Sequence, residues 1–273
     1  MRTAFTGVDV FDGRRVIKDA TLVVVDGKVH KIVARAPAAI DETIGFQGGM
    51  LAPGFVDLQV NGGGGVLLNG QPDLDGIARI VSAHSGLGTI GLLPTLITSG
   101  PETLRATLDA GIAAAAAKLP GFLGLHLEGP HLDPKRPGAH DPALFRRMTK
   151  ADVGMYLEAA RRLPALMITL APASVALSQI AALSEAGIIV SIGHSDTSAE
   201  DARAAFAAGA TCVTHLFNAM SPLGHREPGL VGAALASENV RCGIIADGVH
   251  VAPEVLGIAA RAKRGKDGLF VVT

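Results

Sequence analysis

Three side chains that can bind a metal ion lie at the ends of separate apolar runs. Glu128 ends GLHLE, His194 follows IIVSIG and His215 follows TCVT. One carboxylate and two imidazoles leave an open coordination position on a catalytic Zn2+ ion. An ion there would activate water and polarise a carbonyl group, as hydrolysis of an amide requires. We therefore predict a metal site at these residues; the alternative is that the histidines are buried only for packing.

Other polar residues also stand at the ends of apolar runs. Asp57 and Gln59 end the run that starts at Met50, and Asp247 ends the run that starts at Cys242. His126 is two residues before Glu128 and so projects from the same side of its strand. We expect His126 to orient Glu128 rather than to bind the ion itself.

A phosphate-binding group is predicted in the segment after His215. Arg226, in HREPG, can bind a phosphate through two parallel hydrogen bonds. Asn218 and Ala219 leave the same apolar run, where backbone N–H groups and a side-chain amide could complete an anion site. A salt bridge between Arg226 and Glu227 is the alternative for this arginine.

The elements that would position these residues alternate regularly along the chain. Eight apolar runs predict strands: MLAPGFVDLQV (50–60), TIGLLPTLIT (89–98), GFLGLHLEG (121–129), ALMITLAP (165–172), IIVSIGHS (188–195), TCVTHLFN (211–218), CGIIADGVH (242–250) and LFVVT (269–273). Amphipathic segments between them predict helices over 73–86, 101–119, 149–163, 177–186, 198–208, 229–238 and 253–262. Strands that alternate with helices favour a parallel sheet, and eight continuous apolar strands favour a closed (β/α)8 TIM barrel of the α/β class.

The first 49 residues have a different texture. Short β-like pieces are separated by Asp12-Gly13 and Asp26-Gly27, which favour tight turns. We predict a small β-sandwich part over residues 1–49, without its C-terminal strands, and a barrel over 50–273. The sequence stops on LFVVT with no helix after it, which indicates a chain truncated at the end of the eighth barrel strand.

Composition limits the classes of partner. Lys plus Arg total 24 and Asp plus Glu total 25, so the charge balance gives no reason to expect a nucleic-acid or anionic-membrane partner. Both cysteines, Cys212 and Cys242, lie in apolar runs typical of buried strands. The N-terminus lacks the apolar segment of a signal peptide, and the sequence has no apolar run of transmembrane length, so we expect a soluble cytoplasmic protein.

Several segments of the chain resemble a known family. PGFVDLQVNGGGG, LPTLIT, GLHLEGPHL, PGAHDP, LAPA, SIGHSD, THLFNAM, REPGL and IADGVH follow, in this order, the motifs of N-acetylglucosamine-6-phosphate deacetylases in the amidohydrolase superfamily. The resemblance implies hydrolysis of N-acetyl-D-glucosamine 6-phosphate to D-glucosamine 6-phosphate and acetate, in amino-sugar catabolism and cell-wall recycling. It also implies a homodimer in which a neighbouring subunit supplies part of the phosphate site.

The resemblance also assigns roles to individual residues. Glu128, His194 and His215 would bind the metal, Zn2+ first and Fe2+ or another divalent ion as alternatives. The residues that would bind the substrate are Ala139, His140, Asn218, Ala219, Arg226 and His250. Gln59, His126 and Asp247 would support the site.

The chain departs from the pattern that it resembles in two respects. Asp57 and Gln59 stand where many superfamily members have the His-x-His pair of a two-metal site, and an amide is a poor ligand, so we expect a single ion. The catalytic Asp of the family would be the residue after Thr273, so this chain would hold no general base and would be inactive if it ends there. Two alternatives remain: an amidohydrolase of the aminoacylase, dihydroorotase or adenine deaminase type, or a catalytically dead barrel that binds a sugar phosphate.

Overall fold

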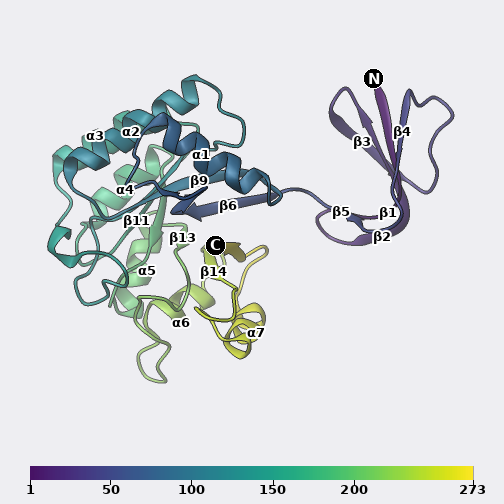
Figure 1. Ribbon diagram of the computed structural model, residues 1–273. Helices are drawn as coiled ribbons and strands as arrows, with labels where there is room; N and C mark the ends of the chain where they lie inside the picture. The colour runs from purple at the N-terminus through teal and green to yellow at the C-terminus, as the bar shows by residue number, and fades with distance from the viewer. Residues whose placement is uncertain (273) are drawn as a thin grey trace. The chain divides into compact units, whose positions relative to one another are not determined.

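The computed structural model describes residues 1–272, which form two compact units, one over Met1–Phe55 and one that begins at Val56. Each unit has its own sheet, and each is described by itself. Figure 1 shows the strands and helices of both units.

The first unit is a five-stranded sheet. Its strands are β1 (Arg2–Phe11), β2 (Val16–Val25), β3 (Lys28–Val33), β4 (Glu42–Gly45) and β5 (Met50–Leu51), in the order β3-β2-β1-β4 with β5 also paired to β1. Asp26 and Gly27 join β2 to β3 with φ of 49° and 77°. Positive φ at both central residues is the geometry that a two-residue hairpin requires, so the predicted turn is confirmed there.

The segment from Met50 differs from its prediction. We expected one strand over 50–60, but Met50 and Leu51 pair in parallel with Asp9 and Val10 of β1. The strand of the larger sheet is β6 (Phe55–Val60), which begins after Pro53. Proline has no N–H to donate to a ladder, which explains why one apolar run becomes two strands.

The second unit contains eight parallel strands in a nearly closed barrel, as predicted. Along the sheet the order is β15-β14-β13-β12-β11-β10-β9-β6, so each neighbour is also the next barrel strand in sequence. Beyond β6 the strands are β9 (Thr89–Ile97), β10 (Leu125–Glu128), β11 (Leu166–Leu170), β12 (Ile189–Ile192), β13 (Cys212–Val213), β14 (Arg241–Ile245) and β15 (Leu269–Val272). A small ribbon of β7 (Gly62–Gly63) and β8 (Val66–Leu67) follows β6.

Seven helices alternate with the barrel strands, at the seven places that the sequence predicts. They are α1 (Leu74–Ser85), α2 (Pro101–Ala116), α3 (Lys150–Ala160), α4 (Leu177–Glu185), α5 (Ala199–Ala207), α6 (Gly229–Ala236) and α7 (Pro253–Ala262), with a short 3-10 helix η1 (Pro142–Leu144). Side chains of Asp73, Thr149 and Ser198 cap α1, α3 and α5 by accepting backbone N–H groups. Among the described residues, no helix is long and apolar enough to cross a bilayer.

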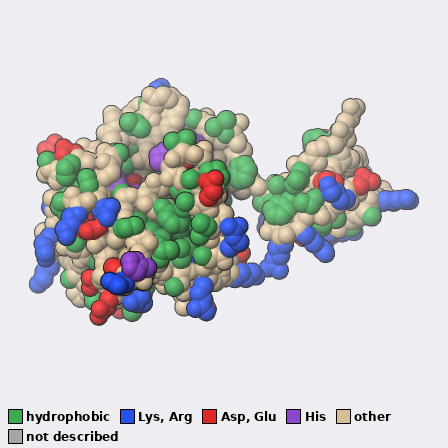
Figure 2. Space-filling view, turned by 90° about the horizontal axis from the view of Figure 1, so that it is seen from below, with side chains coloured by type: hydrophobic (Ala, Val, Ile, Leu, Met, Phe, Trp, Pro, Cys, Tyr) green, Lys and Arg blue, Asp and Glu red, His purple; other side chains and the backbone are tan. Residues whose placement is uncertain are grey.

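The main core of the protein lies in this second unit and includes Leu127, Ile168, Val190 and Ile192, which are fully buried. Side chains of both charges are mixed over the face in Figure 2, in keeping with the nearly equal numbers of acidic and basic residues. Parallel strands end on the same side of a barrel, so the residues after β6, β10, β12, β13 and β14 come together there.

Candidate metal centre and active site

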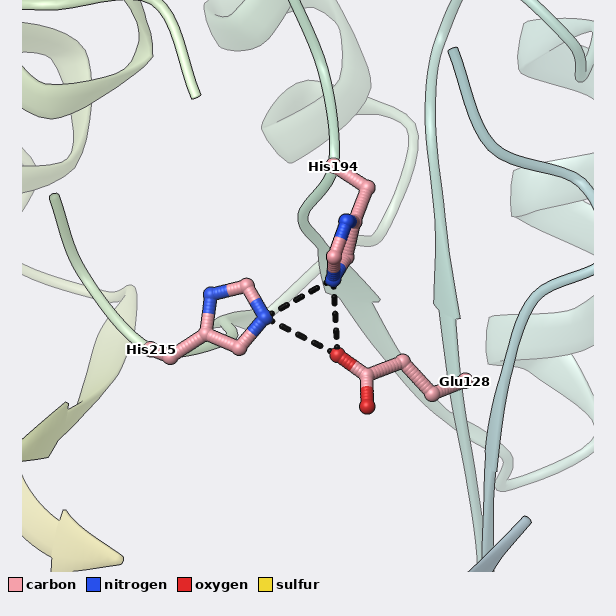
Figure 3. Close-up of side chains that lie close together, drawn as sticks. All are labelled: Glu128, His194 and His215. Atoms are coloured by element: carbon pink, nitrogen blue, oxygen red, sulfur yellow. Dashed lines mark hydrogen bonds and ion pairs between the residues drawn. The ribbon is translucent and has the colours of Figure 1, made fainter. Parts of the chain in front are cut away.

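Glu128, His194 and His215 converge at the ends of three barrel strands (Figure 3). Glu128 is the last residue of β10, while His194 and His215 each come two residues after β12 and β13. One ligand atom from each lies within 4.8 Å of the others. Glu128 Oε1 lies 3.1 Å from His194 Nε2 and 2.9 Å from His215 Nε2. The two Nε2 atoms lie 2.9 Å from each other.

The chemistry of this donor set fits a divalent ion. His194 donates its Nδ1–H to the backbone carbonyl of Arg136 at 3.0 Å, because a carbonyl can only accept. Its Nε2 therefore holds the free lone pair and points at Glu128. Two imidazoles and one carboxylate, with room for a fourth ligand, are the donors of a catalytic zinc site. The chain therefore has a possible metal-binding site.

The protonation states of the group suit a cation. Burial alone would raise the pKa of Glu128, but the adjacent imidazoles of His194 and His215 hold this pKa well below its usual range. Glu128 is 2% exposed, so a buried carboxylate remains ionised. Burial would lower the pKa of His215, yet its hydrogen bond to Glu128 raises it. A negative charge at this depth requires a positive partner, which a metal ion would supply.

Backbone strain is concentrated around the same residues. His194, His215, Phe217 and Ala219 have φ of 44°, 33°, 79° and 48°. Non-glycine residues in this region cost about 1–3 kcal/mol each, and such residues cluster at functional sites. The fold therefore holds both histidines in conformations that the free chain would avoid.

Gln59, in β6, lies beside Glu128. Its side-chain amide donates to Glu128 Oε2 at 3.1 Å, while its backbone N–H donates to Asp57 Oδ1 at 3.0 Å. The two oxygens of Glu128 are thus divided: Oε2 accepts from Gln59 and Oε1 faces the histidines. Because its amide nitrogen donates to Glu128, Gln59 adds no ligand to the group formed by Glu128, His194 and His215.

His126 lies inside the barrel, below Glu128, and is fully buried. Its Nε2 is 2.7 Å from the Thr169 hydroxyl and its Nδ1 is 3.3 Å from the Thr95 hydroxyl. Burial lowers the pKa of His126 to about 4, so the ring is neutral near pH 7. Both ring nitrogens of His126 have threonine hydroxyl partners. The ring therefore faces Thr95 and Thr169 rather than His194 and His215.

His140 reaches the site from the loop after β10. The backbone N–H of Thr98 donates to His140 Nδ1 at 3.3 Å, so the ring proton is on Nε2. That Nε2 lies 3.8 Å from Glu128 Oε2, and the ring centroid is 4.3 Å from that of His194. Burial lowers the pKa of His140 to about 4. His140 is therefore a neutral hydrogen-bond donor at the edge of the metal-binding group.

A pocket of about 300 Å3 lies over these side chains, and histidines are visible within a hollow of the larger unit in Figure 2. Of the residues predicted to bind substrate or metal or to support them, those that line the pocket are Gln59, Glu128, Ala139, His140, His194, His215, Asn218, Ala219 and His250. Four lining residues were not predicted: Asn61, Ile97, Gly138 and Ile245. Three of these end or follow a barrel strand, so position alone could have indicated them, but two are apolar and offer no chemical signal.

Three predicted residues do not line this pocket: His126, Arg226 and Asp247. Arg226 is exposed in the loop between β13 and α6 and does not line it. Asp247 lines a neighbouring cavity of about 570 Å3 that shares Gln59, Asn61 and His250 with the pocket. Its carboxylate accepts the Nδ1–H of His250 at 2.7 Å, and this bond and two backbone N–H groups lower the pKa of Asp247 to about 2. The position predicted for the catalytic Asp, after Thr273, is outside the described residues.

Comparison with known proteins places the chain in a family. The amidohydrolase family model matches residues 50–272. The chain is 45% identical over 225 residues to N-acetylgalactosamine-6-phosphate deacetylase of Shewanella sp. (strain ANA-3), which covers 82% of this chain and 56% of that protein. It is 37% identical over 288 residues to N-acetylglucosamine-6-phosphate deacetylase of Homo sapiens, which covers 98% of this chain and 68% of that protein.

A solved structure agrees with these relatives. N-acetylglucosamine-6-phosphate deacetylase from Pasteurella multocida superposes with a TM-score of 0.91 at 32% identity, over 100% of this chain and 71% of that one. The chain thus spans little more than half of the Shewanella protein and about two thirds of the others. On its sequence and its fold alike, the chain belongs to the amidohydrolase family and, within it, to the branch of the N-acetylglucosamine-6-phosphate deacetylases.

Proposed function

We propose that this chain forms the metal-binding barrel of an enzyme that hydrolyses N-acetyl-D-glucosamine 6-phosphate to D-glucosamine 6-phosphate and acetate. The observation that carries the proposal is the convergence of Glu128, His194 and His215 below a pocket of about 300 Å3. The relatives named as deacetylases of N-acetylated hexosamine 6-phosphates support the substrate class. They do not favour an aminoacylase, a dihydroorotase, an adenine deaminase or an inactive binding protein.

The residues of the pocket have distinct proposed tasks. An ion held by Glu128, His194 and His215 would supply a Lewis acid for amide hydrolysis. His140 would donate its Nε2–H to the acetyl oxygen as negative charge develops there. Its tautomer supports this task, because Thr98 occupies Nδ1 and leaves the proton on Nε2. The proton transfers to and from water and the amine would need the Asp predicted after Thr273.

The sugar would lie against the loops after β10, β13 and β14. Ala139, Asn218, Ala219 and His250 all line the pocket and are proposed to contact it. The side-chain nitrogen of Asn218 is buried and has no hydrogen-bond partner among the described residues, so it is free to donate to a bound hydroxyl or phosphate. Asp247 would fix the orientation of His250 through the 2.7 Å hydrogen bond.

We propose one divalent ion per chain, with Zn2+ as the first candidate and Fe2+ as the alternative. The donation from Gln59 to Glu128 supports a single ion, since this amide offers no ligand comparable to an imidazole. Cytoplasmic location stays a prediction from the sequence.

A second substrate is favoured by one observation. The Shewanella relative, named for N-acetylgalactosamine 6-phosphate, is 45% identical to this chain, whereas the human relative is 37% identical. We therefore propose the galacto epimer as the alternative substrate. Both sugars present the same acetamide and phosphate, so the same metal-binding residues would serve either reaction.

Arg226 is proposed to bind phosphate across a homodimer. It is exposed and lies outside the pocket of its own chain, and none of the described residues forms an ion pair with it. Arg226→Ala should raise KM for the phosphorylated sugar far more than for N-acetylglucosamine. Mixing an Arg226→Ala chain with a Glu128→Ala chain separates the two possibilities. Recovered activity would require that Arg226 acts on the neighbour's site, while no recovery would place its role within one chain.

Acetate release tests the function directly. A protein that continues past Thr273 should release acetate from N-acetylglucosamine 6-phosphate, and Glu128→Ala should abolish the release. The same assay with the galacto epimer ranks the two substrates by kcat/KM. A protein that binds one ion and either sugar phosphate but releases no acetate would refute hydrolysis and favour a binding role.

A further inference from the structure

The loop after β10 contacts His194 at successive points. The backbone N–H of Asp133 donates to the His194 carbonyl at 3.0 Å, and the Arg136 carbonyl accepts from His194 Nδ1 at 3.0 Å. Gly138 packs directly on the ring: a Cβ at this position would lie 2.9 Å from His194 Cε1. The ring is therefore held from its backbone, its Nδ1 and one face by residues 133–138.

Side chains tie this loop to the loop that carries His194. Asp133 is 7% exposed, and its carboxylate accepts the backbone N–H groups of Lys135 and Asp196, both at 3.0 Å. The Arg136 guanidinium donates back to Asp196 Oδ1, at 2.8 Å from Nε and 2.7 Å from the terminal nitrogen. Asp133, Arg136 and Asp196, named here the His194 clamp, thus link the two loops in both directions.

The clamp acts on a strained residue. His194 has a φ of 44°, which a non-glycine residue adopts only when its surroundings impose it. The hydrogen bond to Asp133 fixes the His194 carbonyl, and the hydrogen bond to Arg136 fixes the ring. Without them, the backbone would be free to relax and the imidazole free to turn its Nε2 away from Glu128.

We propose that the His194 clamp is the positioning device of the metal site: it holds the Arg136 carbonyl against Nδ1 so that His194 presents the lone pair of Nε2 beside Glu128. The inference rests on the metal site proposed above. None of the three clamp residues lines the pocket over Glu128, so they would act through His194. Groups that orient a ligating histidine in this way typically change metal affinity about 10- to 100-fold when they are removed.

Metal affinity of the 273-residue chain tests the proposal. Co2+ would be titrated into the metal-free chain against a chromophoric chelator, and its visible absorption spectrum would report the ligand geometry. Arg136→Ala and Asp196→Asn should each raise the Kd for Co2+ by about tenfold or more and alter the spectrum. The double variant should have the same Kd for Co2+ as the single variant that binds less tightly. Both substitutions remove the same interaction, the ion pair between Arg136 and Asp196. Arg136→Lys, which keeps the charge, should recover most of the affinity.

The control is Glu238→Gln, which breaks the exposed pair of Glu238 and Arg264, 2.8 Å long. This variant should bind Co2+ as the wild type does, and a cooperative thermal transition in each metal-free variant shows that it is folded. If Arg136→Ala and Asp196→Asn bind Co2+ with wild-type affinity, or if their losses of affinity add up in the double variant, the proposed role of the clamp is refuted. The metal site itself would still stand. If the wild type binds no Co2+, or binds it equally well after Glu128→Ala, the metal site itself is refuted together with the clamp.

Discussion

Gln59 and Glu128 are joined by a hydrogen bond of 3.1 Å between the side-chain amide and Oε2, where both residues are buried. This bond uses one oxygen of the carboxylate and leaves the other to His194 and His215. A donor at this place also offsets part of the cost of burying an ionised carboxylate. Gln59 thus links the end of β6 to the metal-binding group.

Replacing Gln59 with Leu should weaken both folding and metal binding. Glu128 Oε2 would lose the hydrogen bond from the Gln59 amide in a buried site, at a cost of about 1–3 kcal/mol in the free energy of unfolding of the metal-free chain. Urea denaturation measures this change, and a Co2+ titration measures affinity. Gln71→Leu is the matched control, because Gln71 also donates to a carboxylate, Asp73, but at an exposed position. Equal losses in the two variants would contradict the special role of Gln59.

Elemental analysis should find one divalent ion per chain after dialysis against Zn2+. An ion held in the folded chain by Glu128, His194 and His215 should, at a concentration of 100 times the Kd, stabilise the fold by about 2.7 kcal/mol. A chelator should lower the melting temperature accordingly, and Glu128→Ala should abolish this response. Two ions per chain would show that Gln59 and its neighbours provide a second site.

The sequence predicted the barrel because its signals are local. The apolar runs that form β10 and β11 are buried on both faces, and each amphipathic segment needs only its own periodicity. Met50 and Leu51 were assigned to the wrong sheet because their partner strand, β1, lies about 40 residues earlier and Pro53 was not given weight.

The site was predicted only in part, for a related reason. Glu128, His194 and His215 end strands, so the barrel geometry alone brings them together. The contacts between His194 and the loop after β10 depend on backbone carbonyls and positive φ values, which residue type does not reveal. The guanidinium of Arg226 indicates that this residue can bind phosphate. Its position in a loop, however, does not specify which pocket it faces.

Gly138→Ala should weaken metal binding without a comparable loss of folding. A Cβ at Gly138 would lie 2.9 Å from His194 Cε1, so the ring would have to move. Gly187→Ala is the control, since Gly187 has a φ of 80° but no atom within 4 Å of its added Cβ. Both variants carry the backbone strain, and only Gly138→Ala should raise the Kd for Co2+, by about tenfold. The same Kd in both variants would contradict a steric effect on His194.

Asp152→Asn should destabilise the barrel by about 2 kcal/mol, through loss of the two 2.6 Å hydrogen bonds from Arg146. This figure allows for solvent screening, because the Arg146 side chain is 39% exposed. Glu158→Gln, at the exposed pair with Arg161, should change the free energy of unfolding by less than about 1 kcal/mol. Urea denaturation at pH 7 compares the two, and equal effects would refute the prediction.

The pH dependence of the Asp152 effect follows from its carboxyl group. Burial alone would raise the pKa of Asp152, but hydrogen bonds from Arg146 and Thr149 lower it below that of the unfolded chain. The stabilisation is therefore fully present above the unfolded pKa, about 3.9, and is lost as the pH falls through the lower folded pKa. The difference between wild type and Asp152→Asn should stay constant from pH 7 to pH 5 and narrow only in stronger acid.

His131 should make the wild-type chain less stable as the pH falls from 7 to 5. Burial lowers the pKa of His131, whose Nδ1 donates to the Arg146 carbonyl at 3.0 Å and whose Nε2 is 3.0 Å from the Tyr156 hydroxyl. Between the lowered folded pKa and the unfolded value of about 6.5, the unfolded chain binds more protons, so the free energy of unfolding rises with pH. His131→Asn removes this titration while its amide can still donate to Arg146.

The variant isolates His131 from the other buried histidines, because His126 and His140 titrate equally in both chains. His131→Asn should cost roughly 2 kcal/mol at pH 7, since the Tyr156 hydroxyl loses its acceptor. At pH 5 the cost should be smaller, because the wild type has by then lost the stability that a neutral His131 confers. Urea denaturation at both pH values measures the two costs. Equal costs would mean that His131 has the same pKa in the folded and unfolded chains, despite its complete burial.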